Sequence, residues 1–266
     1  MPSPKLPLPV ALLWIMGSVF VVTGSVYSLW TWNLYQKVAK EKAPVLCHIM
    51  QTRPHTDALK ADYLAEILGL SRDHPTPLKE FDIRKAMHQL QEMPMIKEAK
   101  VMTLAEDTVY IDYTMREPIA MVYDYENIAV DEEGFLFPFS PFYSPKDLPE
   151  LYFGFIEQKS SEHSFIKPLE GPEWKLATHL VKILSEKAQE EKVRLQRVDI
   201  SHAFAKSLGR QEIVISFGVG DANVHYLRLH PREYEQQLGN YFALYSQLPL
   251  EEKVIDLRIG GLAFIK

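Results

Sequence analysis

The sequence is poor in cysteine: Cys47 is the only one in 266 residues. A single thiol excludes an intramolecular disulfide framework, and it excludes a zinc site built from several thiolates of this chain alone. Because Cys47 stands in the apolar run "VLCHIMQT", the sequence predicts a small buried side chain there rather than a reactive thiol.

Basic runs and catalytic motifs are missing as well. The formal net charge is −6, the pI is near 5.9, and no stretch combines clustered Lys and Arg with aromatic residues, which argues against nucleic acid as a partner. No HExxH, Walker A or GxSxG motif occurs, and the nine histidines are scattered. "GVGDAN" at residues 218–223 lacks the third glycine of a dinucleotide loop and predicts a hairpin. We therefore expect no enzyme activity, catalytic residue, metal site or cofactor.

One long apolar segment is present near the N-terminus. No charged residue occurs between Lys5 and Lys37, and residues 10–29 form a continuous apolar block. At about 1.5 Å per residue this block reaches roughly 30 Å, enough to cross the hydrocarbon core of a bilayer. A cleaved signal peptide is the alternative, but its apolar core is usually shorter and follows a more basic start. We expect residues 1–36 to form a short tail and a retained membrane helix.

Residues 43–117 predict the order strand, helix, helix, strand, strand. We expect Asp57 to cap the first helix and Gly69 to end it. The pair Thr76-Pro77 predicts the start of the second helix. The runs "IKEAKVMTL" and "TVYIDYTMRE" then predict two strands.

Residues 118–266 predict short strands interrupted by two helices, "PEWKLATHLVKILSEKAQEE" and "PREYEQQLGNYFALYSQL", each opening with proline. The overall prediction is an α+β chain whose second soluble domain is a mixed β-sheet flanked by helices. Within it, Asp131-Glu132-Glu133-Gly134 separates two apolar runs, which predicts a strand turn and leaves a metal or acid/base role as the alternative.

Taken in order, several motifs resemble the bacterial cell-division protein family FtsQ/DivIB. They are the apolar helix, the stretch "LQEMPMIKEAKVMTLAEDTVYIDYTMREPIAMV", then "AVDEEGFLF", "LPELYFG", "REYEQQLGNYFALYSQL" and "VIDLRIGGLAFIK". The resemblance implies a POTRA-like β-α-α-β-β domain over residues 43–117 and an FtsQ-type β domain over residues 118–266.

The resemblance also implies a function and a location. The chain would be a single-pass protein of the bacterial inner membrane, with a cytoplasmic N-terminus and both soluble domains outside that membrane, at the division septum. It would act as a scaffold. Its partners would be small coiled-coil division proteins of the FtsB/DivIC and FtsL kind, and through them the FtsW/FtsI-like septal peptidoglycan synthase complex.

In the family the partner's strand adds at the last strand, so the resemblance implies a binding edge in "IGGLAFI" if that run lies at the edge of a sheet. The resemblance aligns Arg258 with a family arginine that could pair with an acidic partner residue, and the alternative is a solvated surface charge. Gly260-Gly261 is either a plain turn or a point of close backbone approach. The predicted partner-binding residues are Arg258, Ile259, Gly260, Gly261, Leu262, Ala263 and Phe264.

Two rival functions stay open at this point. A POTRA-bearing transport or assembly factor is one, although secretion proteins of that kind continue into a long barrel. A membrane-anchored extracytoplasmic hydrolase is the other, and a pocket with convergent His, Asp and Ser side chains would support it.

Overall fold

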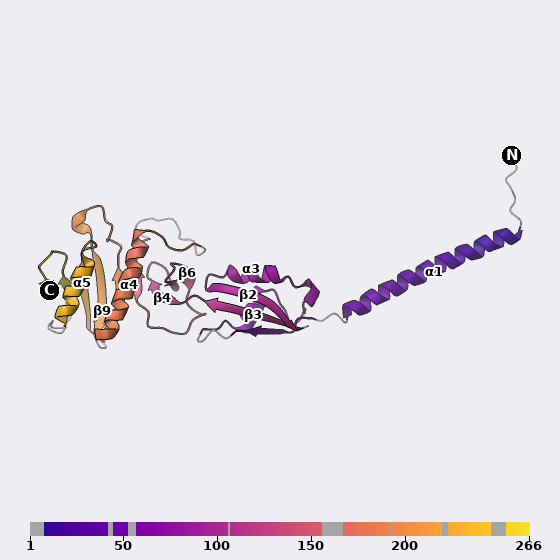
Figure 1. Cartoon of the computed structure of the whole chain (residues 1–266), viewed down its shortest axis with the longest axis horizontal. Coiled ribbons are helices and arrows are strands. Elements are labelled where there is room, and N and C mark those ends of the chain that lie inside the picture. The colour runs from indigo at the N-terminus through magenta and orange to yellow at the C-terminus, as the bar shows by residue number, and fades with distance from the viewer. Residues whose placement is uncertain are drawn as a thin grey trace, which may run out of the picture.

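A computed structural model describes residues 8–41, 45–52, 57–105, 107–155, 167–191, 193–219, 223–245 and 254–266. The chain is α+β: a long N-terminal helix precedes a three-stranded sheet and then a nine-stranded mixed sheet, with helices interspersed. The three-stranded sheet lies between the N-terminal helix and the nine-stranded sheet (Figure 1). This architecture confirms the predicted fold class.

The N-terminal helix α1 runs over Leu8–Glu41. Within it, Leu12–Val38 is a 27-residue candidate span whose most apolar 18-residue window has a mean hydropathy of 1.7, and none of that window is buried against the rest of the chain. At about 1.5 Å per residue the segment is roughly 40 Å long, which is more than a bilayer core requires. Its length and composition are those of a signal anchor or a signal sequence.

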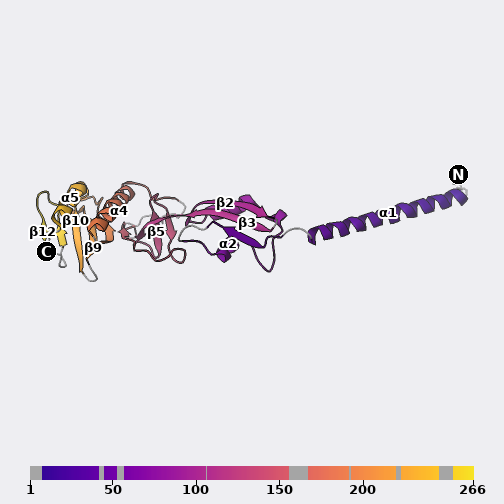
Figure 2. The same ribbon diagram turned by 60° about the horizontal axis from the view of Figure 1, so that its bottom comes forward.

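The first soluble part has the predicted element order. β1 (His48–Gln51), α2 (Ala61–Ile67), α3 (Ile83–Gln91), β2 (Ile96–Ala105) and β3 (Thr108–Met115) follow one another, with a short 3₁₀ turn, η1 (Leu78–Glu80), before α3. β3 is central: it pairs with β1 in parallel and with β2 antiparallel. Figure 2 shows α2 beside this sheet.

Both helix starts were predicted too early. α2 begins after Lys60, which makes no side-chain cap, so the assignment of Asp57 as a cap is wrong. Pro77 precedes η1 rather than α3, and α3 begins after Asp82, whose carboxylate accepts hydrogen bonds from two backbone N–H groups of the first turn. Asp82 thus accepts hydrogen bonds from backbone N–H groups at the start of α3 that have no partner within the helix. Pro77 lies too far along the chain to contact them.

The burial predicted for Cys47 is also wrong, because its side chain is exposed. Successive side chains of an extended segment point to opposite faces, and here Leu46 takes the inward direction and is buried. Gly69 does end α2 as predicted: it has φ of +64°, and its N–H donates to Glu66 O at 3.0 Å.

The second soluble part is built on the nine-stranded sheet, whose spatial order is β12-β11-β10-β9-β8-β7-β4-β5-β6. The first four strands in sequence are β4 (Pro118–Val122), β5 (Ile128–Asp131), β6 (Leu136–Pro138) and β7 (Glu150–Tyr152). The remaining five are β8 (Arg194–Asp199), β9 (Ile213–Val219), β10 (Asn223–Leu229), β11 (Val254–Asp256) and β12 (Phe264–Ile265), with a 3₁₀ turn η2 (Leu208–Arg210) before β9. The antiparallel pairing of β9 with β10 confirms the hairpin predicted from "GVGDAN", although its turn, 220–222, lies outside the described residues.

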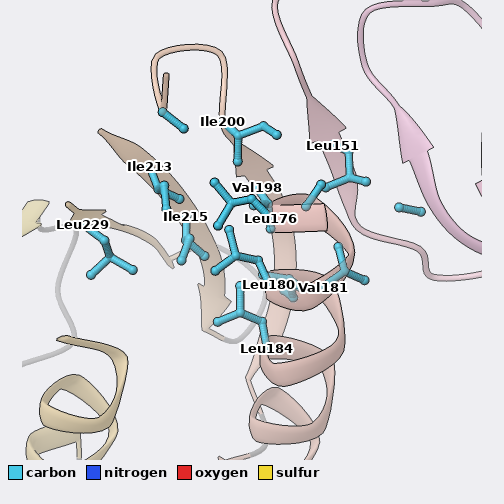
Figure 3. Packing of buried hydrophobic residues seen from close by; sticks show 14 of the residues in the cluster. Leu151, Leu176, Leu180, Val181, Leu184, Val198, Ile200, Ile213, Ile215 and Leu229 are labelled. Atoms are coloured by element: carbon cyan, nitrogen blue, oxygen red, sulfur yellow. The ribbon is translucent and has the colours of Figure 1, made fainter. Parts of the chain in front are cut away.

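Two helices accompany this sheet, α4 (Pro172–Glu191) and α5 (Tyr234–Leu244). α4 has the predicted bounds, whereas α5 starts three residues after Pro231, which lies in the preceding turn. Leu176, Leu180 and Leu184 form one stripe of α4 and pack onto Val198 and Ile215 of the sheet (Figure 3). Burial of each such side chain contributes about 1.5–3 kcal/mol, so this stripe anchors α4 on the sheet.

The turn predicted at Asp131-Glu132-Glu133-Gly134 is confirmed, because β5 and β6 pair antiparallel on either side of it. The Asp131 carboxylate accepts the Phe135 N–H at 2.8 Å, and Gly134 has φ of +90°. Asp131 also pairs with Arg116 at 2.7 Å. Arg116 lies in the segment between β3 and β4, so this ion pair ties the two soluble parts together.

Further contacts cross the same junction. The Asp57 carboxylate accepts hydrogen bonds from the N–H and hydroxyl of Ser144 at 2.9 and 2.8 Å, and it pairs with Lys146 at 2.7 Å. The Tyr143 hydroxyl donates to Arg116 O at 2.8 Å. Burial alone would raise the pKa of Asp57, but the hydrogen bonds from Lys146 and Ser144 outweigh it and hold that pKa below its usual value.

Candidate functional site

The edge of the nine-stranded sheet that ends in β12 is the candidate site. β12 pairs antiparallel with β11, and among the described residues no strand pairs with its other side. The Val254 N–H donates to Lys266 O at 3.0 Å, and the Lys266 N–H donates to Val254 O at 3.1 Å. Backbone direction alternates along a strand, so Lys266 and Phe264 face β11, whereas the N–H and C=O of Ile265 face outward.

The predicted binding segment is only partly a strand. Residues 257–263 form the connection from β11 to β12, and of the predicted residues Phe264 alone lies in β12. The connection turns where the Leu262 N–H donates to Ile259 O at 3.1 Å. Gly261 has φ of +74°, a conformation that glycine adopts without steric cost. Gly260-Gly261 therefore lies in a turn, and a longer strand cannot form there.

Apolar side chains are exposed along this connection and strand. Ile259 and Leu262 are each 56% exposed, Phe264 is 54% exposed and Ile265 is 47% exposed. Ile265 was not among the predicted site residues, although the apolar run "LAFI" contains it. Four large apolar side chains beside an unpaired strand edge make a surface that a partner strand could cover.

Arg258 is held within the chain rather than solvated, so the surface-charge alternative is wrong. Its guanidinium donates to the Asp256 carboxylate at 2.7 Å and pairs with Glu212 at 3.1 Å, and its side chain is 25% exposed. Arg228 pairs with both acids as well. The hydrogen bonds from Arg258 lower the pKa of Asp256. This network fixes the direction in which the chain leaves β11.

The network could not be found from the sequence. Glu212 precedes β9, Arg228 lies in β10 and Asp256 lies in β11, so only the register of three strands brings them together. An acidic partner residue would have to compete with Glu212 and Asp256 for Arg258. Its predicted pairing with a partner stays a prediction.

No chemistry-bearing cluster stands out elsewhere in the described residues. They hold no group of three or more His, Cys, Asp or Glu side chains that could bind a metal ion. Asp124 is buried, which raises its pKa, and its carboxylate accepts hydrogen bonds from the Phe153 and Phe155 N–H groups. It therefore braces the loop that follows β7.

A groove between β1 and α2 has an enzyme-like set of residue types, since Cys47, His48, Asp62 and Ser71 all line it. They do not act on one another. The His48 imidazole lies 4.0 Å from Asp107, Asp62 pairs with Arg72, and the Ser71 hydroxyl accepts the Asp73 N–H. No nucleophile is hydrogen-bonded to a base here, which is the contact that nucleophilic catalysis requires.

Comparisons with known proteins add no identity: no protein-family model matches the chain, and a search of curated proteins finds no match.

Proposed function

We propose that this chain is a non-enzymatic, single-pass scaffold of the bacterial division machinery. It links small coiled-coil division proteins of the FtsB/DivIC and FtsL kind to the FtsW/FtsI-like septal peptidoglycan synthase complex. In this proposal α1 spans the inner membrane with a cytoplasmic N-terminus, and the two sheets lie outside that membrane at the septum.

The observation that carries the proposal is the β12 edge. Its outward backbone groups pair with no strand among the described residues, and an added partner strand would bond to them by β-augmentation. The exposed side chains of Ile259, Leu262, Phe264 and Ile265 surround that edge, so an added strand would also bury apolar area. Support for the identity of the partner comes from the ordered motifs that resemble the FtsQ/DivIB family.

Partner recovery with two matched variants tests the proposal. The full chain, in detergent, is incubated with membrane extract from dividing bacterial cells, and bound FtsB/DivIC-like and FtsL-like proteins are quantified. Ala263 lies directly before β12, and no backbone hydrogen bond to β11 among the described residues uses its N–H, so Ala263→Pro removes a donor beside the strand edge. Ala263→Gly keeps that donor and is the control.

We expect Ala263→Pro to lower recovery of both partners at least tenfold and Ala263→Gly to keep it within a factor of two or so. Phe264→Asp provides a second variant, which places a charge in the contact area without changing the backbone. Equal recovery by all three variants would move the binding site away from β12. Failure of the unmodified chain to recover either partner would contradict the proposed function itself.

A further inference from the structure

A second sheet edge without a partner strand lies along β1, His48–Gln51, in the other sheet from β12. Just before β1, the Leu46 N–H donates to Thr76 O at 2.9 Å, so this edge begins at His48. The His48 and Thr52 N–H groups donate to Asp107 O at 3.1 Å and to Ile111 O at 3.0 Å, so the backbone of these alternate residues faces β3. The N–H and C=O groups of Ile49 and Gln51 must then face outward. Among the described residues, β3 is the only strand that pairs with β1.

The composition of the two edges of this sheet is not the same. Natural sheets protect their edges from adding strands with charged residues and bulges. β2, at one edge, carries Lys97, Glu98 and Lys100, and its register with β3 is interrupted twice. β1, with the sequence HIMQ, has no Lys, Arg, Asp, Glu or Pro. The β2 edge thus has features that hinder strand addition, and the β1 edge lacks them.

A groove of about 450 Å³ lies along the β1 edge. Leu46 and Ile49 line it on the strand side, and Ala61 and Ala65 line it on the α2 side. The two alanines leave room above the helix for a side chain of medium size. The charged pair at the rim, Asp62 and Arg72, has no net sign. Together these features fit an uncharged extended segment with β-branched apolar residues at alternate positions.

We propose that the outer edge of β1 is a docking site for such a segment of a partner protein. The segment adds to the three-stranded sheet as a fourth strand, bonded to the backbone of Ile49 and Gln51, and sends alternate side chains into the groove beside α2. This site lies on a different sheet from β12 and takes a second partner, whether or not the proposed division role holds.

The test uses the full chain in detergent and a synthetic peptide of about eight residues that alternates valine and threonine, a typical strand length. Amide hydrogen exchange is followed at Ile49 and Gln51, whose N–H groups the added strand would engage. Alkylation of Cys47, the single and exposed thiol in the groove lining, is followed in parallel. We expect the peptide to slow both at least tenfold and to leave the amides of β2 unchanged.

Two pairs of variants locate the site. Ile49→Pro removes an outward N–H that β3 does not use, and Ile49→Ala keeps it; we expect only the proline variant to lose peptide binding. Ala65→Glu fills the groove from the α2 side and should weaken binding at least tenfold even if Ile49→Pro disturbs the strand. Glu66→Gln, one residue further along α2 and outside the groove lining, is its control and should bind normally.

Three results would overturn the proposal. The first is absence of protection at Ile49 and Gln51 at saturating peptide, and the second is normal binding by Ala65→Glu. The third is protection that rises with protein concentration when no peptide is present, because the occupant would then be a second copy of this chain. None of these results bears on partner recovery at β12, so the two proposals succeed or fail separately.

Discussion

The three consecutive carboxylates of the β5–β6 turn should differ sharply in what they contribute to stability. The Asp131 side chain is 6% exposed and lies 2.7 Å from the Arg116 guanidinium, which is itself 11% exposed. At an effective dielectric constant of about 20, two unit charges at that separation attract by roughly 6 kcal/mol, and desolvation of the two ions offsets much of it. Removal of one partner is more costly than the net worth of the pair, because the other charge stays buried.

We therefore expect Asp131→Ala to lower the free energy of unfolding by about 3 kcal/mol, at the low end for a broken buried pair. The value is low because the Glu133 carboxylate remains 3.3 Å from the Arg116 guanidinium and still neutralises part of its charge. Asp131→Asn keeps an oxygen for the Phe135 N–H and should cost about 1.5–2 kcal/mol. Glu132→Gln changes an exposed carboxylate and should stay within about 0.5 kcal/mol.

Pulse proteolysis across a urea gradient measures these differences on the full chain in detergent. The single variant Arg116→Met and the double variant Arg116→Met/Asp131→Ala complete a double-mutant cycle. We expect the double variant to lose less stability than the two single variants do in sum, because it leaves no buried charge alone. If Asp131→Ala and Glu132→Gln were equally stable within about 0.5 kcal/mol, the reasoning from burial would be refuted.

Two further perturbations test the contacts that join and shape the soluble parts. Because the pKa of Asp57 lies below its usual value of 3.8, its bond to Lys146 stabilises the fold above that pH and is lost as the pH falls through the folded-state pKa. Acid titration of unfolding should therefore show a loss of stability below about pH 4 that is smaller in Asp57→Asn, and identical curves would contradict it. Gly134→Ala should cost more than about 2 kcal/mol, since φ is +90° and a Cβ atom would lie 2.8 Å from Leu169 O. Gly209→Ala, with open space around it, is the control in a thermal melt, and equal melting temperatures would refute the steric reasoning.

Local patterns in the sequence were sufficient for most of the elements. The apolar stripe of α4 and its opening Pro172 predict both its bounds and its buried face. The D-E-E-G turn is likewise a short-range signal, since Asp131 and Gly134 satisfy the turn within a few residues. The errors arise where a side chain finds a distant partner. Asp57 precedes a helix and looks like a cap, yet it binds Ser144, which lies 87 positions away.

The candidate site likewise has features that the local sequence predicts and features that depend on distant contacts. An apolar C-terminal strand was predictable from "LAFI", but its place at the sheet edge depends on β11 pairing with β10 rather than with β12 alone. The shortness of β12 follows from Gly261, whose positive φ turns the chain before a longer strand can pair. The groove beside β1 had no local signal, because α2 and β1 each contribute only one wall of it.

The junction between the two sheets bears on how the proposed scaffold would work. The sequence predicts a domain boundary between residues 117 and 118. Across that boundary, Phe137 and Tyr143 from the second part share one buried cluster with Leu90 and Ile111 of the first. With the bonds of Asp57 and Arg116 added, rotation there would expose apolar area and break buried ion pairs together. If both proposed sites are occupied, a partner at β12 would be held at a fixed distance from one at β1, and a change in the position of one partner would be passed to the other.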